Sequence, residues 1–95
     1  MDLVFSGEIV YWRGPSPFHF VVVPDEPSAA IEAVASLVTY GWGVIPVQAR
    51  IGRTEFRTSL FPKAESYLVP IKAAVRRAEE LMLGDNVTIR LHLDA

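Results

Sequence analysis

The sequence predicts a mainly β fold with two helices, arranged as a small, partly open β-barrel of five to six strands. Several segments alternate apolar and polar side chains, which is typical of strands with one buried face. Two other segments repeat apolar residues at helical spacing. The chain has 95 residues, 51% of them hydrophobic, which suits a single domain over residues 1–95. A β-rich chain this short can protect its strand edges by curling into a barrel.

The first part of the chain predicts two strands and a helix. Residues 3–12 alternate and form the first strand. Residues 13–17 hold one glycine and two prolines and form a loop. Residues 18–23 are apolar at nearly every position, so we expect a second strand that is buried on both faces. A helix that opens at residues 24–28 and ends just before Gly41 then separates the second strand from the third. Its apolar stripe consists of Ile31, Val34, Ala35 and Val38.

The middle of the chain predicts a β-hairpin. Residues 44–51 and 54–61 form the third and fourth strands. They are joined by a two-residue turn at 52–53, whose leading glycine favours type II′. Pro46 lies inside the third strand, which places that point at a sheet edge or a bulge.

The last part predicts a short strand, a second helix and a regular final strand. A loop at residues 62–66 precedes a short extended segment at 67–69. Pro70 begins the second helix, in the position where proline is favoured, and Gly84 stops it. Residues 86–94 alternate strictly and form the last strand. The apolar face of that strand consists of Val87, Ile89, Leu91 and Leu93.

Composition and motifs exclude several classes of function. The chain has no cysteine, which excludes disulfides, thiol catalysis and cysteine-ligated metals. There is no Gly-x-Ser-x-Gly elbow, phosphate-binding glycine loop or facing carboxylate pair, so we expect neither an enzyme nor a cofactor. Neither histidine has metal-ligand spacing, so we expect no metal site. No segment is long enough to span a membrane and the N-terminus lacks a secretion signal, so we expect a cytoplasmic protein without membrane contact.

Three segments cover nearly the whole chain and carry a family resemblance. They are GEIVYWRGPSPFHFVVVP (7–24), YGWGVIPVQARIGRTEFRTSLFPK (40–63) and YLVPIKAAVRRAEELMLGDNVTIRL (67–91). All three resemble the bacterial family catalogued as domain of unknown function 1905. The resemblance implies a double-split β-barrel reminiscent of AbrB- and MazE-type regulators and antitoxins, and it implies no established activity. DNA-binding proteins of that kind are usually dimers with a strongly basic face, whereas this chain has a net charge of −2.

Aromatic and arginine side chains gather, in the predicted arrangement, at one end of the barrel. Such residues can stack a planar ligand or a base, or they can simply plug the mouth of the barrel. We therefore expect a non-enzymatic binding module for a small ligand or a protein partner, acting as a monomer or homodimer. The candidate binding residues are Trp12, Arg13, His19, Tyr40, Trp42, Arg50 and Arg57.

A second group of basic residues supports an alternative, a nucleic-acid-binding or antitoxin-like domain. In the predicted second helix the bases precede Glu79 and Glu80, an order that opposes the helix dipole. A broken local rule of this kind can mark an interaction surface. The other explanation is that acids elsewhere in the fold pair with these bases. The residues of this alternative are Lys72, Arg76, Arg77 and the hairpin from Arg50 to Arg57, including Arg53.

Overall fold

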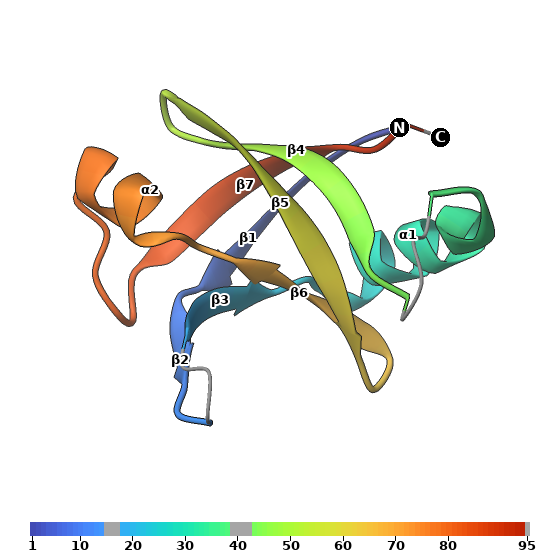
Figure 1. Ribbon diagram of the computed structural model, residues 1–95, viewed down its shortest axis with the longest axis horizontal. Coiled ribbons are helices and arrows are strands. Elements are labelled where there is room, and N and C mark those ends of the chain that lie inside the picture. Colours follow the sequence, from blue (N-terminus) through green and yellow to red (C-terminus); the bar gives the residue numbers. More distant parts are fainter. Residues whose placement is uncertain (15–17, 39–42, 95) are drawn as a thin grey trace.

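The computed structural model describes residues 1–14, 18–38 and 43–94, in which seven strands form one curled sheet, a half-barrel (Figure 1). The strands are β1 (Asp2–Glu8), β2 (Val10–Trp12), β3 (Phe18–Val22), β4 (Ile45–Ile51), β5 (Thr54–Lys63), β6 (Ser66–Pro70) and β7 (Asn86–His92). The helices are α1 (Asp25–Val38) and α2 (Ala73–Ala78). The sheet order is β1-β7-β4-β5-β6-β3-β2, and every neighbouring pair is antiparallel. The predicted class is confirmed, but the prediction of five to six strands was too low.

The predicted first strand is divided in two at Ile9. The Ile9 amide donates to the Asp85 carbonyl at 2.9 Å, and the Gly84 amide donates to the Ile9 carbonyl at 2.9 Å. These bonds take Ile9 out of the ladder, so the chain pairs with β7 before this residue and with β3 after it. One bent segment therefore supplies both end strands of the curled sheet, β1 and β2. At Gly7 it passes so close to β3 that a Cβ atom would lie 2.6 Å from the Val21 side chain.

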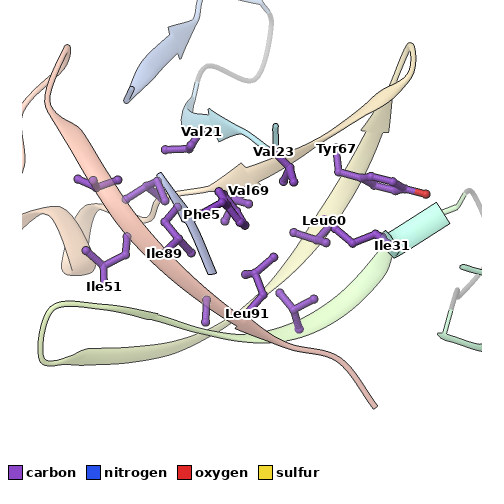
Figure 2. Packing of buried hydrophobic residues seen from close by; sticks show 14 of the residues in the cluster. Phe5, Val21, Val23, Ile31, Ile51, Leu60, Tyr67, Val69, Ile89 and Leu91 are labelled. Carbon is purple, nitrogen blue, oxygen red and sulfur yellow. The ribbon is translucent and has the colours of Figure 1, made fainter. Parts of the chain in front are cut away.

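The core lies on the concave side of the sheet, where apolar side chains from opposite strands point toward one another (Figure 2). Alternation along β4 and β7 predicts these faces correctly. The inward residues are Ile45, Val47, Ala49 and Ile51 of β4, with Val87, Ile89, Leu91 and Leu93 of β7 and the segment after it, and all are buried. Full burial of each large aliphatic side chain contributes about 1.5–3 kcal/mol. Helix α1 packs Ile31 onto this core and contacts β1, β4 and β6.

The predicted second helix, from Pro70 to Gly84, was wrong at both ends. Pro70 lies in β6 opposite Phe20, and the next amide, of Ile71, donates to the His19 carbonyl at 2.9 Å. This pairing keeps the chain extended until Lys72, the N-cap of α2. The helix ends at Ala78, six residues before the expected glycine.

A C-terminal cap explains the early end of α2. Glu80 adopts a φ of +52°, the left-handed conformation that closes many helices. The Leu81 amide donates to the Arg76 carbonyl at 2.8 Å, and the Glu80 amide donates to the Arg77 carbonyl at 3.3 Å. These two bonds are the Schellman pattern, formed here on a glutamate where the sequence rule expects glycine.

The other hairpins show one confirmed turn and one missed turn. The turn at residues 52–53 is present, and Gly52 has a φ of +58°. The predicted loop at 62–66 is wrong, because β5 continues to Lys63 and pairs with Ser66 across a tight turn. Pro46 lies where β4 extends beyond its pairing with β7, so the expected edge position is confirmed.

Candidate functional site

The structure does not bring the predicted aromatic and arginine residues together. Tyr40 and Trp42 lie outside the described residues. Trp12 is at the end of β2, whereas Arg50 is on β4, and three strands separate β2 from β4 in the sheet. In Figure 1 the β4–β5 turn is at the upper edge and β2 is at the lower edge. The expected single site is therefore replaced by separate features on different parts of the sheet.

Trp12 belongs to an apolar layer on the outside of β2, β3, β6 and β5. Side chains directly opposite on paired strands share a face, as do alternate residues along a strand. The pairs Trp12–Phe18 and Val22–Leu68, with Phe61 opposite Leu68, therefore lie on one side of the sheet. We call this the outer apolar face. It consists of Trp12, Phe18, Phe20, Val22, Phe61 and Leu68.

The outer apolar face is separate from the core. Phe20 and Leu68 are buried, yet neither belongs to the interior cluster. The rings of Phe18 and Phe20 lie 5.3 Å apart. Trp12, Val22 and Phe61 remain 43%, 44% and 43% exposed. The expectation that the second strand is buried on both faces was therefore wrong for its outer face, which is apolar without being fully covered.

A basic side chain borders this face. The Lys63 ammonium lies 4.5 Å from the centroid of the Trp12 ring, a cation–π contact that joins β5 to β2. Arg13 follows Trp12 and is exposed. The aromatic feature predicted from sequence therefore consists, in the described residues, of Trp12 with phenylalanine neighbours and a lysine.

His19 and Arg76 contact each other on the opposite side of β3. The Arg76 guanidinium lies 2.9 Å from Nδ1 of His19, and Tyr11 packs on the imidazole at a ring distance of 4.8 Å. A guanidinium only donates hydrogen bonds, so Nδ1 must accept. Burial, followed by the charge of Arg76, lowers the pKa of His19 below its usual 6.5. Both residues thus help hold α2 against β3.

Arg50, Arg57 and Lys72 do come together, on the outside of the other half of the sheet. Gln48 is directly opposite both His92 on β7 and Arg57 on β5. Arg50 is two residues further along β4, and Arg90 is directly opposite Arg50. We call the four basic residues around Gln48 the basic ring. They are Arg50, Arg57, Lys72 and Arg90. Arg90, Gln48 and His92 were not predicted as site residues, because only the strand register reveals their positions.

Two hollows lie on either side of the basic ring. The larger has a volume of about 680 Å³ and the smaller about 330 Å³. The larger is lined by residues that include Leu37, Pro46, Gln48, Arg57, Lys72 and His92. The smaller is lined by residues that include Val4, Gln48, Arg50, Arg90 and His92. Gln48 and His92 border both hollows, and the Lys72 ammonium donates to the Arg57 carbonyl at 3.0 Å.

The charge order of α2 does not oppose the helix dipole, so that prediction was wrong. Arg76 and Arg77 occupy the last turn of the short helix, where positive charge is favourable. Glu79 lies beyond the helix and accepts hydrogen bonds from Thr54 Oγ1 at 2.6 Å and from the Arg53 amide at 3.3 Å. Glu79 therefore stabilises the β4–β5 turn. Its position after the basic residues is explained by these bonds and does not indicate an interaction surface.

His92 lies between two aspartates. Nδ1 is 2.7 Å from Asp2 and Nε2 is 3.4 Å from Asp94. The bond to His92 lowers the pKa of Asp2. Within residues 1–14, 18–38 and 43–94, no group of three or more histidines or acids has the geometry to hold a metal ion. The helices in this part of the chain are too short or too polar to cross a membrane.

Comparison with known proteins identifies the family. The family model named domain of unknown function, DUF1905, matches residues 5–91, which include every strand except the first residues of β1 and the end of β7. The chain belongs to the DUF1905 family. The resemblance predicted from the three sequence segments is therefore confirmed. No curated protein matches the sequence. Membership in DUF1905 specifies no activity, so a function has to be inferred from the surface chemistry of the domain.

Proposed function

We propose that this DUF1905 domain is a non-enzymatic binding module that docks a short segment of a partner protein on the outer apolar face. The observation that carries the proposal is the partly open layer of Trp12, Val22 and Phe61 outside the sheet. Within the described residues, neither helix contacts this face: α1 packs on β1, β4 and β6 from the core side, and α2 packs on β5. Apolar patches rimmed by polar groups often mark interaction sites.

The size of the face favours a segment over a whole protein surface. The exposed fractions of Trp12, Val22 and Phe61 correspond to roughly 250 Å², given the usual areas of these side chains. Stable protein–protein interfaces cover about 800 Å² on each partner. A second copy of the chain would therefore need much more contact than this face offers, whereas one or two apolar side chains of a segment can be covered by it.

The edge of the sheet and the bordering charges specify the partner further. β2 is the last strand of the sheet, and no described strand pairs with its other edge. An extended segment can add to such an edge through main-chain hydrogen bonds and place alternate side chains on the adjoining face. Lys63 borders the face, which favours an acidic residue in the segment. The occupant is thus an extended segment with aromatic or aliphatic residues and a carboxylate.

Peptide titration tests this function. Isotope-labelled protein is mixed with a panel of extended peptides that alternate aromatic and acidic residues, and backbone shifts are followed by NMR. We expect shifts at Trp12, Val22 and Phe61, and loss of binding in Trp12→Ala. The matched control is Val4→Ala, which removes an apolar side chain that is 54% exposed on the other half of the sheet. Shifts that avoid the outer apolar face, or unchanged binding by Trp12→Ala, would refute the proposal.

A nucleic-acid-binding role is the second candidate, because Arg50, Arg57 and Lys72 share one surface with Arg90. Arg76 adds little to it, since its guanidinium is engaged with His19. Titration with single- and double-stranded oligonucleotides at several salt concentrations decides this candidate. Binding that weakens by about one logarithmic unit of affinity per logarithmic unit of salt, for each phosphate contacted, would support it.

We also infer a bacterial cytoplasmic setting and a double-split barrel of the AbrB- and MazE-like kind. The absence of cysteine supports the cytoplasmic location, because it is compatible with a reducing compartment. The bend at Ile9 supports the double-split barrel, because it divides one segment into the two end strands of the sheet. A fluorescent fusion of the full chain tests the location. Light scattering tests whether the domain is a monomer or a homodimer.

A further inference from the structure

The basic ring places like charges where the fold does not require them. Arg50 and Arg90 are directly opposite on neighbouring strands, an arrangement that destabilises a sheet. The three arginines of the ring are exposed on the outside of the sheet, where the core does not require a charged side chain. Arg50 has one acid nearby, Glu55, at 3.8 Å, and both side chains are largely exposed. Such a contact offsets little of the repulsion.

Two guanidinium groups of the ring have no partner in the described part of the chain. Neither Arg57 nor Arg90 makes a side-chain hydrogen bond or ion pair there. Arg57 is directly opposite Gln48, and Arg90 lies diagonally across from it. Planar guanidinium groups of this kind bind carboxylate or phosphate oxygens in a bidentate manner. The half-buried amide of Gln48 adds donors between them.

The surroundings limit the size of an anion that would fit. Asp2 and Asp94 hold His92 on one side of the ring, and Glu55 lies beside Arg50 on the other. Asp94 lines the larger hollow, and Asp2 and Glu55 line the smaller one. A long polyanion crossing the face would pass over all three carboxylates, whereas a compact anionic group above Gln48 would approach fewer of them. The larger hollow also offers apolar contacts at Leu37 and Pro46. Its volume, about 680 Å³, is within the usual range of small-ligand sites.

We propose that the basic ring is a second binding site, for a small molecule with a compact oxyanion group and an apolar body. The oxyanion, a phosphate or a carboxylate, sits above Gln48 between the guanidinium groups of Arg57 and Arg90. The apolar body extends toward Leu37 and Pro46. This site is on the opposite half of the sheet from the outer apolar face, so it is independent of the protein-docking function.

The test uses phosphate probes of increasing complexity with the full chain. Inorganic phosphate, phenyl phosphate and the neutral analogue phenol are titrated while the side-chain signals of Gln48 and of the arginine Nε groups are followed by NMR. We expect both phosphates to shift these signals and phenol to leave them unchanged. We also expect phenyl phosphate to bind about tenfold more tightly than inorganic phosphate, because burying even part of the phenyl ring is worth about 1.4 kcal/mol. The carboxylate phenylacetate, tested in parallel, separates a phosphate site from a carboxylate site.

Matched variants locate the site. Arg57→Gln and Arg90→Gln each remove one charge, and we expect each to weaken phenyl phosphate binding about tenfold. Arg77→Gln removes the same charge elsewhere, so it should leave the affinity for phenyl phosphate within about twofold. Arg90→Lys keeps the charge but loses the bidentate geometry, and we expect an intermediate loss. Thermal melting establishes that each variant is folded.

Three results would overturn the proposal. The first is equal weakening by the ring and control variants, which would mean that only net charge matters. The second is the absence of any shift at Gln48 with phosphate or carboxylate probes. The third is tight binding of a ten-nucleotide single strand with a steep salt dependence, which would make this surface a nucleic-acid site. None of these results bears on peptide binding at the outer apolar face, which the Arg57 and Arg90 variants should retain.

Discussion

The hydrogen bond between Tyr67 and Glu32 makes the stability of the domain sensitive to alkaline pH. Tyr67 lies in β6 and is only 5% exposed, and its hydroxyl donates to the Glu32 carboxylate of α1 at 2.6 Å. Burial first, and the bond and charge of Glu32 next, raise the pKa of Tyr67 from 10.0 to about 12. The folded domain therefore favours the neutral phenol, while the unfolded chain loses the proton near pH 10.

The size of the effect follows from the difference between the two pKa values. Each pK unit corresponds to about 1.4 kcal/mol, so the interval between 10.0 and about 12 represents at most about 3 kcal/mol. This contribution is complete below pH 10. It is lost progressively as the pH rises from 10 toward 12, because deprotonation then favours the unfolded chain.

Tyr67→Phe removes the donor and keeps the ring. At neutral pH we expect the free energy of unfolding to fall by about 1–2 kcal/mol, near the lower end for a hydrogen bond to a charged group, because Glu32 can return to water. This loss corresponds to a decrease of about 5–15 °C in melting temperature for a domain of this size. The variant should also lose less stability than the parent chain between pH 10 and 12. Glu32→Gln should lower the pKa of Tyr67 while burial keeps it above 10.

Absorbance of the phenolate measures the titration, and denaturant unfolding at several pH values measures the stability. The difference between the parent chain and Tyr67→Phe isolates Tyr67 from the other tyrosines. Tyr11→Phe is the matched control, since Tyr11 is 40% exposed. A Tyr67 midpoint near 10, or the same alkaline loss of stability in the parent chain and in Tyr67→Phe, would refute the reasoning.

Three further predictions concern the core, one turn and one histidine. Leu60→Ala, at a fully buried position, should lower the free energy of unfolding by about 2–5 kcal/mol in denaturant titration, and a loss below 1 kcal/mol would contradict the packing. Gly52→Ala should cost about 1–3 kcal/mol, because φ is +58° and the new Cβ would collide with the Glu79 carboxylate; equal stability would exclude this contact. Protonation of His19 puts a second cation beside Arg76, so stability should decline as the pH falls below about 6.5, with an NMR midpoint for His19 below that value. His19→Gln should remove that dependence, and an unaltered pH profile would show that another group causes it.

The alternation of apolar and polar residues predicts the strands well where one face is buried and the other is exposed to solvent. The alternation in β4 and β7 placed every inward residue correctly, because each inward position meets the same core. Local rules failed where a distant segment decides the conformation. Ile9 leaves the ladder because of bonds to Gly84 and Asp85, and Pro70 stays extended because β3 pairs with it. No propensity of the local sequence specifies these contacts.

The candidate site was predictable in its residue types but not in its geometry. The sequence selects Arg50 and Arg57 of the β4–β5 hairpin, and Arg57 does line one hollow together with Lys72. Arg90 and His92 were missed because their proximity depends on the pairing of β7 with β4. The predicted arrangement groups Trp12 with Arg50 at one end of the barrel, yet the sheet order separates them. Register and sheet order, rather than composition, determine which side chains meet.

The place of β7 between β1 and β4 has a consequence for synthesis of the chain. This strand pairs with β1 on one side and with β4 on the other, so Ser6 bonds to Thr88 across 82 positions of sequence. While the ribosome is still translating residues 86–92, β1 and β4 each lack the neighbour that joins them. The β4–β5 and β5–β6 hairpins can form early, since their contacts are local. The apolar side chains of β1 must wait, and during that interval they are available to chaperones or to misassembly.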